Sequence, residues 1–96
     1  MQSHMSVTVS QQLNSLANAV LLTEHARKRM GQRGVKENAI KLALQFGRKI
    51  YSRRALFYVI GQKEITKHGE QYPALKVLEG LQVVVDVENK KILTVY

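Results

Sequence analysis

The stretch LQVVVDVENKKILTVY (residues 81–96) decides the fold class of this protein. Two runs rich in Val, Ile and Leu flank the polar residues ENK, a pattern that is typical of a β-hairpin. The earlier segments KIYS (49–52) and ALFYVIGQ (55–62) have the same β-branched and aromatic character. The second half of the chain therefore predicts a sheet of three or four antiparallel strands.

The length of the last hairpin loop decides which side chains face the core, because a shift of one residue turns every side chain to the opposite face. With a three-residue loop at 88–90, the core face would carry Val83, Val85, Val87, Leu93 and Val95. The outer face would carry Gln82, Val84, Asp86, Ile92, Thr94 and Tyr96. A two-residue loop would reverse this partnership. We favour the three-residue loop, because it leaves no hydroxyl group facing the core.

Helical periodicity dominates the first half of the chain. After Ser10, a residue suited to an N-cap, apolar side chains recur at helical spacing through Leu13, Leu16, Ala17, Val20 and Leu21. Thr23 is a second N-cap candidate, and we expect either a break or a bend there. One helix then ends at Gly34, another spans 36–46 and ends at Gly47, and 63–68 forms a helical turn or a short helix. The order of elements predicts an α+β domain, with two or three N-terminal helices packed on the antiparallel sheet.

The length of 96 residues fits one domain. The opening residues MQSHM resemble a cloning remnant, so we expect a single domain over 6–96. The chain has no cysteine, which excludes disulfides, thiol nucleophiles and cysteine-bound zinc. The apolar patch LANAVLL (16–22) is too short to span a bilayer, and no signal peptide is recognisable. These features predict a cytoplasmic protein that does not contact membranes.

The charge balance points to a negatively charged partner. Fifteen Lys and Arg residues stand against seven Asp and Glu residues, which gives a net charge of +8. On a small domain this charge attracts polyanions, of which nucleic acid is the commonest. The alternative is that the charge serves solubility alone.

The basic residues concentrate in EHARKRMGQRG (24–34). On a helix, His25, Arg29 and Arg33 project from the same side because they lie four residues apart, and Lys28 lies beside them. Like charges at this spacing repel one another unless an anion lies between them. The stripe therefore indicates an anion site, although an ordinary solvated helix face has the same pattern.

Three further features are weaker candidates for a site. Thr94 and Tyr96 share the outer face of the predicted hairpin, where simple β propensity also explains the threonine. Arg53 and Arg54 lie at a hairpin turn, and neighbouring strand residues point opposite ways, so only one would join a given site. His68 lies in the loop-like stretch TKHGEQYP, which is suited to a flap. No spacing of histidines and carboxylates predicts a metal site, and no cofactor motif is present.

Two of these segments carry a family resemblance. H-A-x-x-R-M-x-x-R-G-V (25–35) and V-V-V-D-x-x-x-K-x-I-L-T-V-Y (83–96) resemble a small bacterial family of unknown function. Its members are similar to RelE-type and BrnT-type toxins, compact ribonuclease-like domains of the barnase–EndoU–colicin–RelE group. The resemblance covers residues 23–96.

The resemblance implies a curved antiparallel sheet backed by helices, with RNA bound across the charged side. It also implies cleavage without metal or cofactor by attack of the RNA 2′-hydroxyl, in a toxin that pairs with an acidic antitoxin protein. By matching motifs, His25 would be the base or acid, and Arg29 and Arg33 would hold the phosphate. Thr94 and Tyr96 would orient the phosphate or donate to it. RNA contacts would come from Lys28, Arg33, Arg53, Arg54 and His68.

Two other functions fit the same sequence. One is a non-catalytic module that binds RNA or DNA, and the other is a protein-interaction domain with an acidic partner. The two Phe, four Tyr and absent Trp argue against an extensive base-stacking platform. Binding directed at phosphates, with little reading of sequence, fits this composition better.

Overall fold

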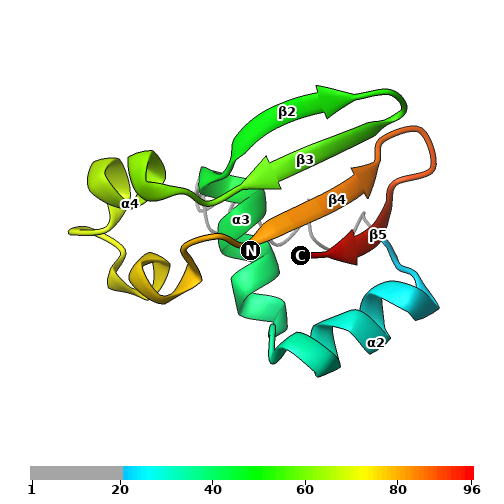
Figure 1. Cartoon of the computed structure of the whole chain (residues 1–96), viewed down its shortest axis with the longest axis horizontal. Coiled ribbons are helices and arrows are strands. Elements are labelled where there is room, and N and C mark those ends of the chain that lie inside the picture. Colours follow the sequence, from blue (N-terminus) through cyan, green and yellow to red (C-terminus); the bar gives the residue numbers. More distant parts are fainter. Residues whose placement is uncertain (1–20) are drawn as a thin grey trace, which may run out of the picture.

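The computed structural model describes residues 21–96 as helices packed on an antiparallel sheet (Figure 1). The antiparallel strands are β2 (Arg48–Ser52), β3 (Ala55–Val59), β4 (Gln82–Asp86) and β5 (Lys91–Val95). The two-residue strand β1 (Leu21–Leu22) adds a parallel pairing to β5, so the strand order is β1-β5-β4-β3-β2. The α+β prediction is confirmed.

The basic helix α2 (Glu24–Arg33) begins and ends where the sequence predicted. Thr23 caps it, since its Oγ1 accepts a hydrogen bond from the backbone N–H of Ala26 at 3.0 Å. Gly34 ends it in the left-handed conformation, with φ 69°. Because Leu21 and Leu22 form the strand β1, α2 does not extend back through them. Of the two predictions for this point, a break in the helix or a bend in one long helix, the break is confirmed. The predicted helix after Ser10 lies outside the described residues.

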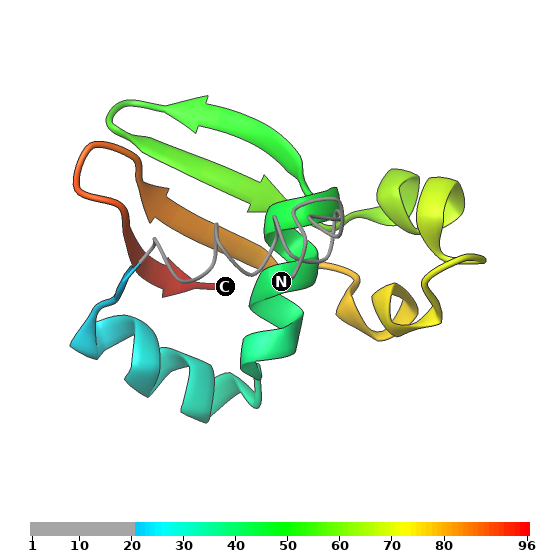
Figure 2. The ribbon, with the colours of Figure 1, turned by 180° about the vertical axis from the view of Figure 1, so that it is seen from behind.

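Helix α3 (Glu37–Phe46) covers one face of the sheet, as the view from behind shows (Figure 2). Its buried residues recur at the spacing of one helix face: Ala39, Ile40, Ala43 and Leu44. The end of α3 differs from prediction, because Gly47 is extended, with φ −66° and ψ 147°. A Cβ atom there would lie 2.5 Å from the carbonyl oxygen of Ala43 and 3.1 Å from the backbone of Val59. Close approach of the chain, rather than a left-handed turn, explains this glycine.

The register of the last hairpin is partly as predicted. Val83 pairs with Val95 and Val84 with Thr94, so the faces assigned to these residues are confirmed. A bulge between Val84 and Val85 then brings Val85 opposite Ile92. The predicted faces of Ile92 and Leu93 are therefore wrong: Ile92 is 1% exposed in the core, and Leu93 lines a hollow on the outer face.

The turn of that hairpin is also longer than predicted. It spans residues 87–90, one more than the expected loop. Val87 belongs to the turn and is half exposed, so its predicted place in the core is wrong. Local side-chain alternation contains no signal for the inserted residue.

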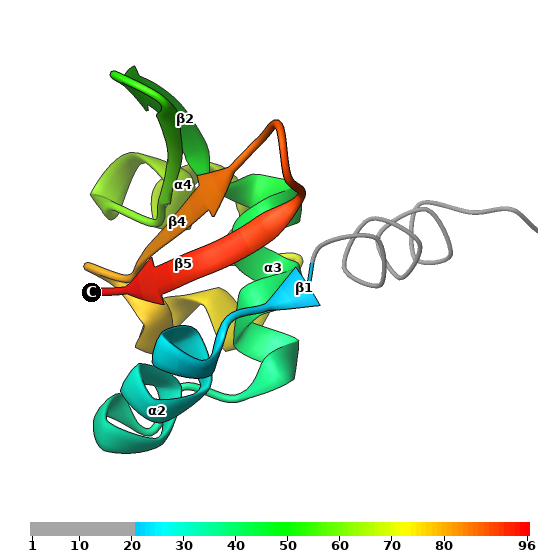
Figure 3. The same ribbon diagram turned by 90° about the vertical axis from the view of Figure 1, so that its right-hand side faces the viewer.

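A single hydrophobic cluster lies between the sheet and the helices α2 and α3. The sheet supplies the side chains on its α3 side: Leu56, Tyr58, Val83, Val85, Ile92 and Val95. Val84 is buried but does not belong to this cluster, since it lies on the other face. In the ribbon views of residues 21–96, no helix packs across that other face (Figure 3). We call it the open face of the sheet.

The remaining elements lie at the end of the molecule away from the two hairpin turns (Figure 1). Helix α4 (Gln62–His68) confirms the short helix predicted there, and a 3₁₀ segment (Pro73–Leu78) follows it. Glu64 connects α4 to the sheet, because it accepts from the backbone N–H of Gly61 at 2.7 Å and pairs with Arg48 at 3.3 Å. Within residues 21–96, no helix has the length and apolar character needed to cross a bilayer.

Candidate nucleic-acid interface

Helix α2 is attached along the part of strand β5 that β1 does not cover. Thr23 donates from its hydroxyl to the carbonyl oxygens of Ile92, at 2.9 Å, and Leu93, at 3.2 Å. Nearly two turns further along the helix, Nε of Arg29 donates to the carbonyl of Val95 at 3.4 Å. These contacts satisfy carbonyl groups that an edge strand otherwise presents to solvent. The helix therefore runs beside β5 in the same direction as the strand.

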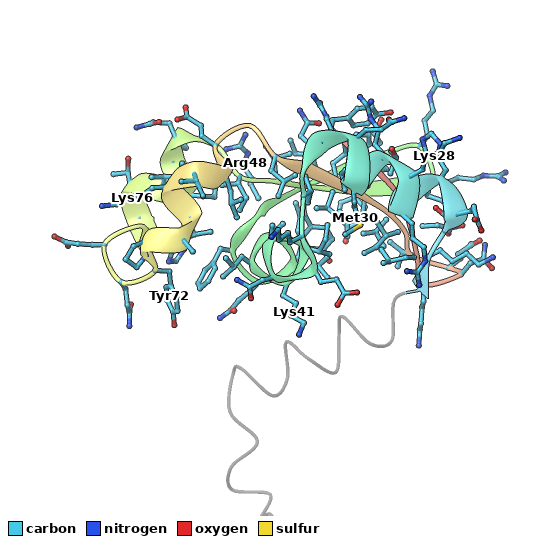
Figure 4. All side chains as sticks on the ribbon, turned by 90° about the horizontal axis from the view of Figure 1, so that it is seen from below. Lys28, Met30, Lys41, Arg48, Tyr72 and Lys76 are labelled. Atoms are coloured by element: carbon cyan, nitrogen blue, oxygen red, sulfur yellow. The ribbon has the colours of Figure 1, made fainter. Side chains whose placement is uncertain are left out.

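This arrangement places the predicted basic stripe along β5. Ala26 and Met30 are the buried residues of α2, and Lys28 points away from the body of the molecule (Figure 4). His25 and Arg33 are exposed, and Arg29 between them is half buried. From His25 to Arg33 the helix rises about 12 Å, which is close to the length of four strand residues. The stripe is long enough to meet more than one phosphate of a nucleic-acid strand.

The cations of α2 have no acidic partner in the described part of the chain. The one ion pair among residues 21–96 joins Arg48 and Glu64, at the other end of the sheet. Arg29 also donates to the side-chain oxygen of Gln32 at 3.4 Å. A guanidinium group carries five N–H donors, so Arg29 retains donors that make no hydrogen bond to this part of the chain.

A hollow of about 300 Å³ lies at the C-terminal end of α2. Arg33 and Tyr96 line it together with the backbone around Gly34 and Gly80. The one carboxylate that lines the hollow belongs to Glu79. When the Gln62 amide is oriented to donate, its nitrogen lies 3.2 Å from Oε1 and 3.0 Å from Oε2 of Glu79. The structure thus places Arg33 and Tyr96, two of the predicted site residues, at the same hollow.

Thr94 differs from the other predicted catalytic residues because its side chain is buried, with 8% exposed. Its hydroxyl group has no hydrogen-bond partner among the described residues. Its cross-strand neighbours place it on the open face, in the row Ile50, Phe57, Val84 and Thr94. A buried hydroxyl without a hydrogen-bond partner destabilises a fold. The Thr94 hydroxyl therefore either binds a ligand or lowers the stability of the protein.

The structure separates His25 from Tyr96. Both lie beside the basic stripe, but His25 is in the first turn of α2 and Tyr96 lines the hollow at its end. The helix rises about 12 Å between His25 and Arg33, so His25 and Tyr96 lie at different ends of the basic stripe.

Arg53 and Arg54 form the turn between β2 and β3, and both are exposed. They line a second hollow, of about 380 Å³, on the open face. Its floor contains Phe57 and Leu93. Because Thr23 donates to the carbonyl of Leu93, this hollow lies near the first turn of α2, where His25 is located. Both arginines line this one space, although the alternation of strand residues predicted that only one would join a site.

His68 lies far from this surface. It ends α4, and its ring packs on Phe46 with 4.7 Å between ring centroids. Tyr72 packs on the same ring at 4.6 Å. Tyr72 and Lys28 lie at opposite ends of the molecule (Figure 4). The structure thus places His68 in an aromatic cluster rather than in a flap over the basic helix.

Acidic residues that no sequence pattern singled out border the second hollow. Asp86, Glu88 and Asn89 line it opposite the arginine turn. Oδ2 of Asp86 accepts from the side-chain nitrogen of Asn89 at 2.8 Å, and Oδ1 accepts from its backbone N–H at 3.3 Å. These hydrogen bonds hold the pKa of Asp86 below its ordinary value. The turn sequence DVENK contained these residues, but only the pairing of strands shows what they face.

The geometry defines an α+β domain whose basic helix runs along the edge of an antiparallel sheet. Residues 22–96 match a protein family described as a domain of unknown function, DUF4258, and the chain belongs to this family. No curated protein matches the chain, and no solved structure matches it. Among residues 21–96, no group of three or more His, Asp or Glu side chains is arranged to hold a metal ion.

Proposed function

We propose that α2 and the end of β5 form a surface that binds the phosphate backbone of single-stranded RNA. The observation that carries this proposal is that Lys28, Arg29 and Arg33 gather along one edge of the sheet without an acidic partner in residues 21–96. An RNA strand supplies the negative charge that relieves repulsion between them. The resemblance to RelE-type domains favours RNA as the nucleic acid.

The test is the salt dependence of binding, because each neutralised phosphate releases counterions. A fluorescently labelled 12-nucleotide RNA would be titrated at several KCl concentrations. The double variant Lys28→Gln/Arg33→Gln should reduce the slope of log K against log salt by about 1.4, at about 0.7 per contact with a single strand. An unchanged slope would rule out α2 as the phosphate-binding surface.

A matched control removes the same charge elsewhere. Lys63 and Lys67 are both exposed on α4, at the other end of the molecule. Lys63→Gln/Lys67→Gln should leave the slope nearly as it is in the parent protein. Equal losses in the two double variants would mean that net charge, and not this surface, attracts RNA.

Metal-independent cleavage of the bound RNA is the second candidate function. The observation that favours it is that an exposed imidazole, His25, lies on the same helix as the phosphate-binding cations. In this proposal, His25 removes the proton of a ribose 2′-hydroxyl, and the 2′-oxygen attacks the adjacent phosphorus. The bond to the 5′-oxygen breaks, a 2′,3′-cyclic phosphate forms, and the departing 5′-oxygen takes up a proton from solvent water. Arg29 steadies the phosphate, and Arg33 and Tyr96 hold the strand further along.

If the protein cleaves RNA as a toxin, we expect it to bind a protein partner as well. A toxin of this kind is held inactive by an acidic antitoxin protein, and an acidic segment would compete with RNA for the cations of α2. The same K28Q/R33Q variant would then lose affinity for both ligands. Competition between the labelled RNA and a polyglutamate peptide tests whether one surface serves both.

A further inference from the structure

The hollow between the two hairpin turns combines three kinds of lining. Phe57 and Leu93 form an apolar floor, Arg53 and Arg54 lie on one side, and Asp86 lies on the other. Its volume of about 380 Å³ falls in the range of small-molecule sites, roughly 300–1,000 Å³. Although opposite charges line the same space, they form no ion pair with each other in the described structure. Both therefore remain available to a ligand.

The carboxylate of Asp86 is oriented before any ligand arrives. Asn89 donates to each of its two oxygens, from its side chain at 2.8 Å and from its backbone at 3.3 Å. A carboxylate has about four acceptor positions, so acceptor positions remain beside the hydrogen bonds from Asn89. Two acceptors side by side fit a ligand edge that presents two neighbouring N–H donors.

The arginine turn shows backbone strain. Arg53 has φ 57°, a left-handed conformation that glycine adopts far more readily than an arginine. Two-residue hairpin turns usually have Gly, Asn or Asp at such a position. Arginine at this position therefore costs stability, and backbone strain of this kind clusters at sites where side chains bind ligands.

We propose that this hollow binds one nucleotide of the RNA, and that guanine is the base that fits it; the inference rests on the proposed function. The ring would lie on Phe57 and Leu93, as unstacked bases of RNA lie on apolar and aromatic side chains. The N1–H and 2-amino groups of guanine, which neighbour each other, would donate to Asp86. The nucleotide phosphate would lie at Arg53 and Arg54, away from the carboxylate. Adenine, cytosine and uracil lack this pair of neighbouring donors.

The experiment titrates the whole protein with single nucleotides and follows backbone amide shifts by NMR. Guanosine 5′-monophosphate should bind with shifts at Phe57, Leu93 and Asp86. Inosine 5′-monophosphate lacks only the 2-amino group and should bind about tenfold more weakly, the size of effect expected for one lost hydrogen bond to a charged group. Equal affinities for the two nucleotides would overturn the inference, as would shifts confined to α2.

Two variants separate the parts of the site. Asp86→Asn should bring the affinity for guanosine monophosphate down to that for inosine monophosphate. Glu70→Gln removes one exposed carboxylate that lines neither hollow and should change neither affinity. Arg53→Gly should weaken binding of the monophosphate but not of guanosine, without lowering the melting temperature. If Asp86→Asn binds guanosine monophosphate as the parent does, the base assignment is wrong.

Failure of the guanine assignment and failure of the proposed RNA-binding surface on α2 would give different results. If RNA binding keeps its salt slope and its dependence on Lys28 and Arg33 but shows no preference for guanine, the nucleotide hollow alone is refuted. If guanosine monophosphate binds in the hollow but Lys28→Gln/Arg33→Gln leaves the salt slope unchanged, the phosphate surface on α2 is refuted and the hollow stands.

Discussion

Arg29 lies against the last residues of the chain, with its Nε donating to the carbonyl oxygen of Val95 at 3.4 Å. The residue is at once a member of the basic stripe and a link between α2 and the edge of the sheet. A substitution at this position therefore changes stability as well as charge. The exposed cations of the same helix change charge alone, and the comparison between them separates the two effects.

Arg29→Gln should lower the free energy of unfolding by about 1 kcal/mol, because it removes a charge-assisted hydrogen bond that is half exposed and long. Lys28→Gln is the matched control, since Lys28 is exposed one position away on the same helix and should change stability by less than about 0.5 kcal/mol. Urea denaturation followed by circular dichroism measures both. Equal stability of the two variants would show that the contact with Val95 contributes nothing.

Thr94→Val should raise the free energy of unfolding by about 1 kcal/mol, because the buried hydroxyl has no partner in the described structure and valine has nearly the same shape. Thr66→Val, at an exposed position of α4, should have little effect. A gain in stability accompanied by weaker RNA binding would assign the Thr94 hydroxyl to the ligand. A loss of stability would mean that the hydroxyl is bound to a group within the folded protein.

Two glycines should respond in opposite directions to alanine. Gly47→Ala should destabilise the fold by about 1–3 kcal/mol, since its Cβ would meet the backbone of Ala43 and Val59. Gly31→Ala should stabilise it by up to about 1 kcal/mol, because Gly31 is in α2 with open space around it and alanine favours helix. Thermal unfolding of the two variants tests the pair. An unchanged or raised melting temperature of Gly47→Ala would contradict the crowding described at Gly47, and a lowered one of Gly31→Ala would contradict the open space at Gly31.

The hydrogen bonds at Asp86 should make the stability of the protein depend on pH in the acid range. Hydrogen bonds from Asn89 hold the pKa of Asp86 below its ordinary value of 3.8. Since the folded pKa is the lower one, the stabilisation is present above pH 3.8 and is lost as the pH falls through the folded value. Asn89→Ala should return the pKa toward 3.8 and lower stability at pH 7, with the difference shrinking in acid.

The measurement is an NMR titration of the Asp86 carboxyl carbon in the parent protein and in Asn89→Ala. Melting temperatures at pH 7 and near pH 2 supply the second readout. An unchanged pKa in the variant would mean that another group lowers it.

The cleavage proposal rests on His25. A chimeric oligonucleotide with one ribonucleotide in a DNA backbone, incubated with the protein and a chelator, should be cut at that ribonucleotide and leave a 2′,3′-cyclic phosphate. His25→Ala should slow the reaction by at least about a hundredfold, while RNA binding through Arg33 and Lys28 persists. Equal cleavage by the parent and His25→Ala would exclude His25 as the base. Absence of cleavage with salt-sensitive binding would leave the non-catalytic RNA-binding function.

The sequence determined the elements of this fold because their signals are local. The Thr23 cap, the left-handed Gly34 and the buried spacing of α3 each depend on residues within a turn or two of one another. The strands on either side of Arg53 and Arg54 were also predictable from β-branched and aromatic residues. Composition alone indicated the basic character of the protein.

The tertiary structure decided how these elements meet. A bulge exchanged the faces of Ile92 and Leu93, and no local pattern marks an inserted residue whose effect depends on the partner strand. The contacts from Thr23 and Arg29 to β5 join residues 66 to 70 positions apart. Strand pairing likewise set the arginine turn near Asp86, and the ring of His68 at the end of α4 packs on Phe46 of α3. Helix propensity and charge act over a few residues, whereas the site depends on packing between distant segments, which no stretch of the sequence specifies alone.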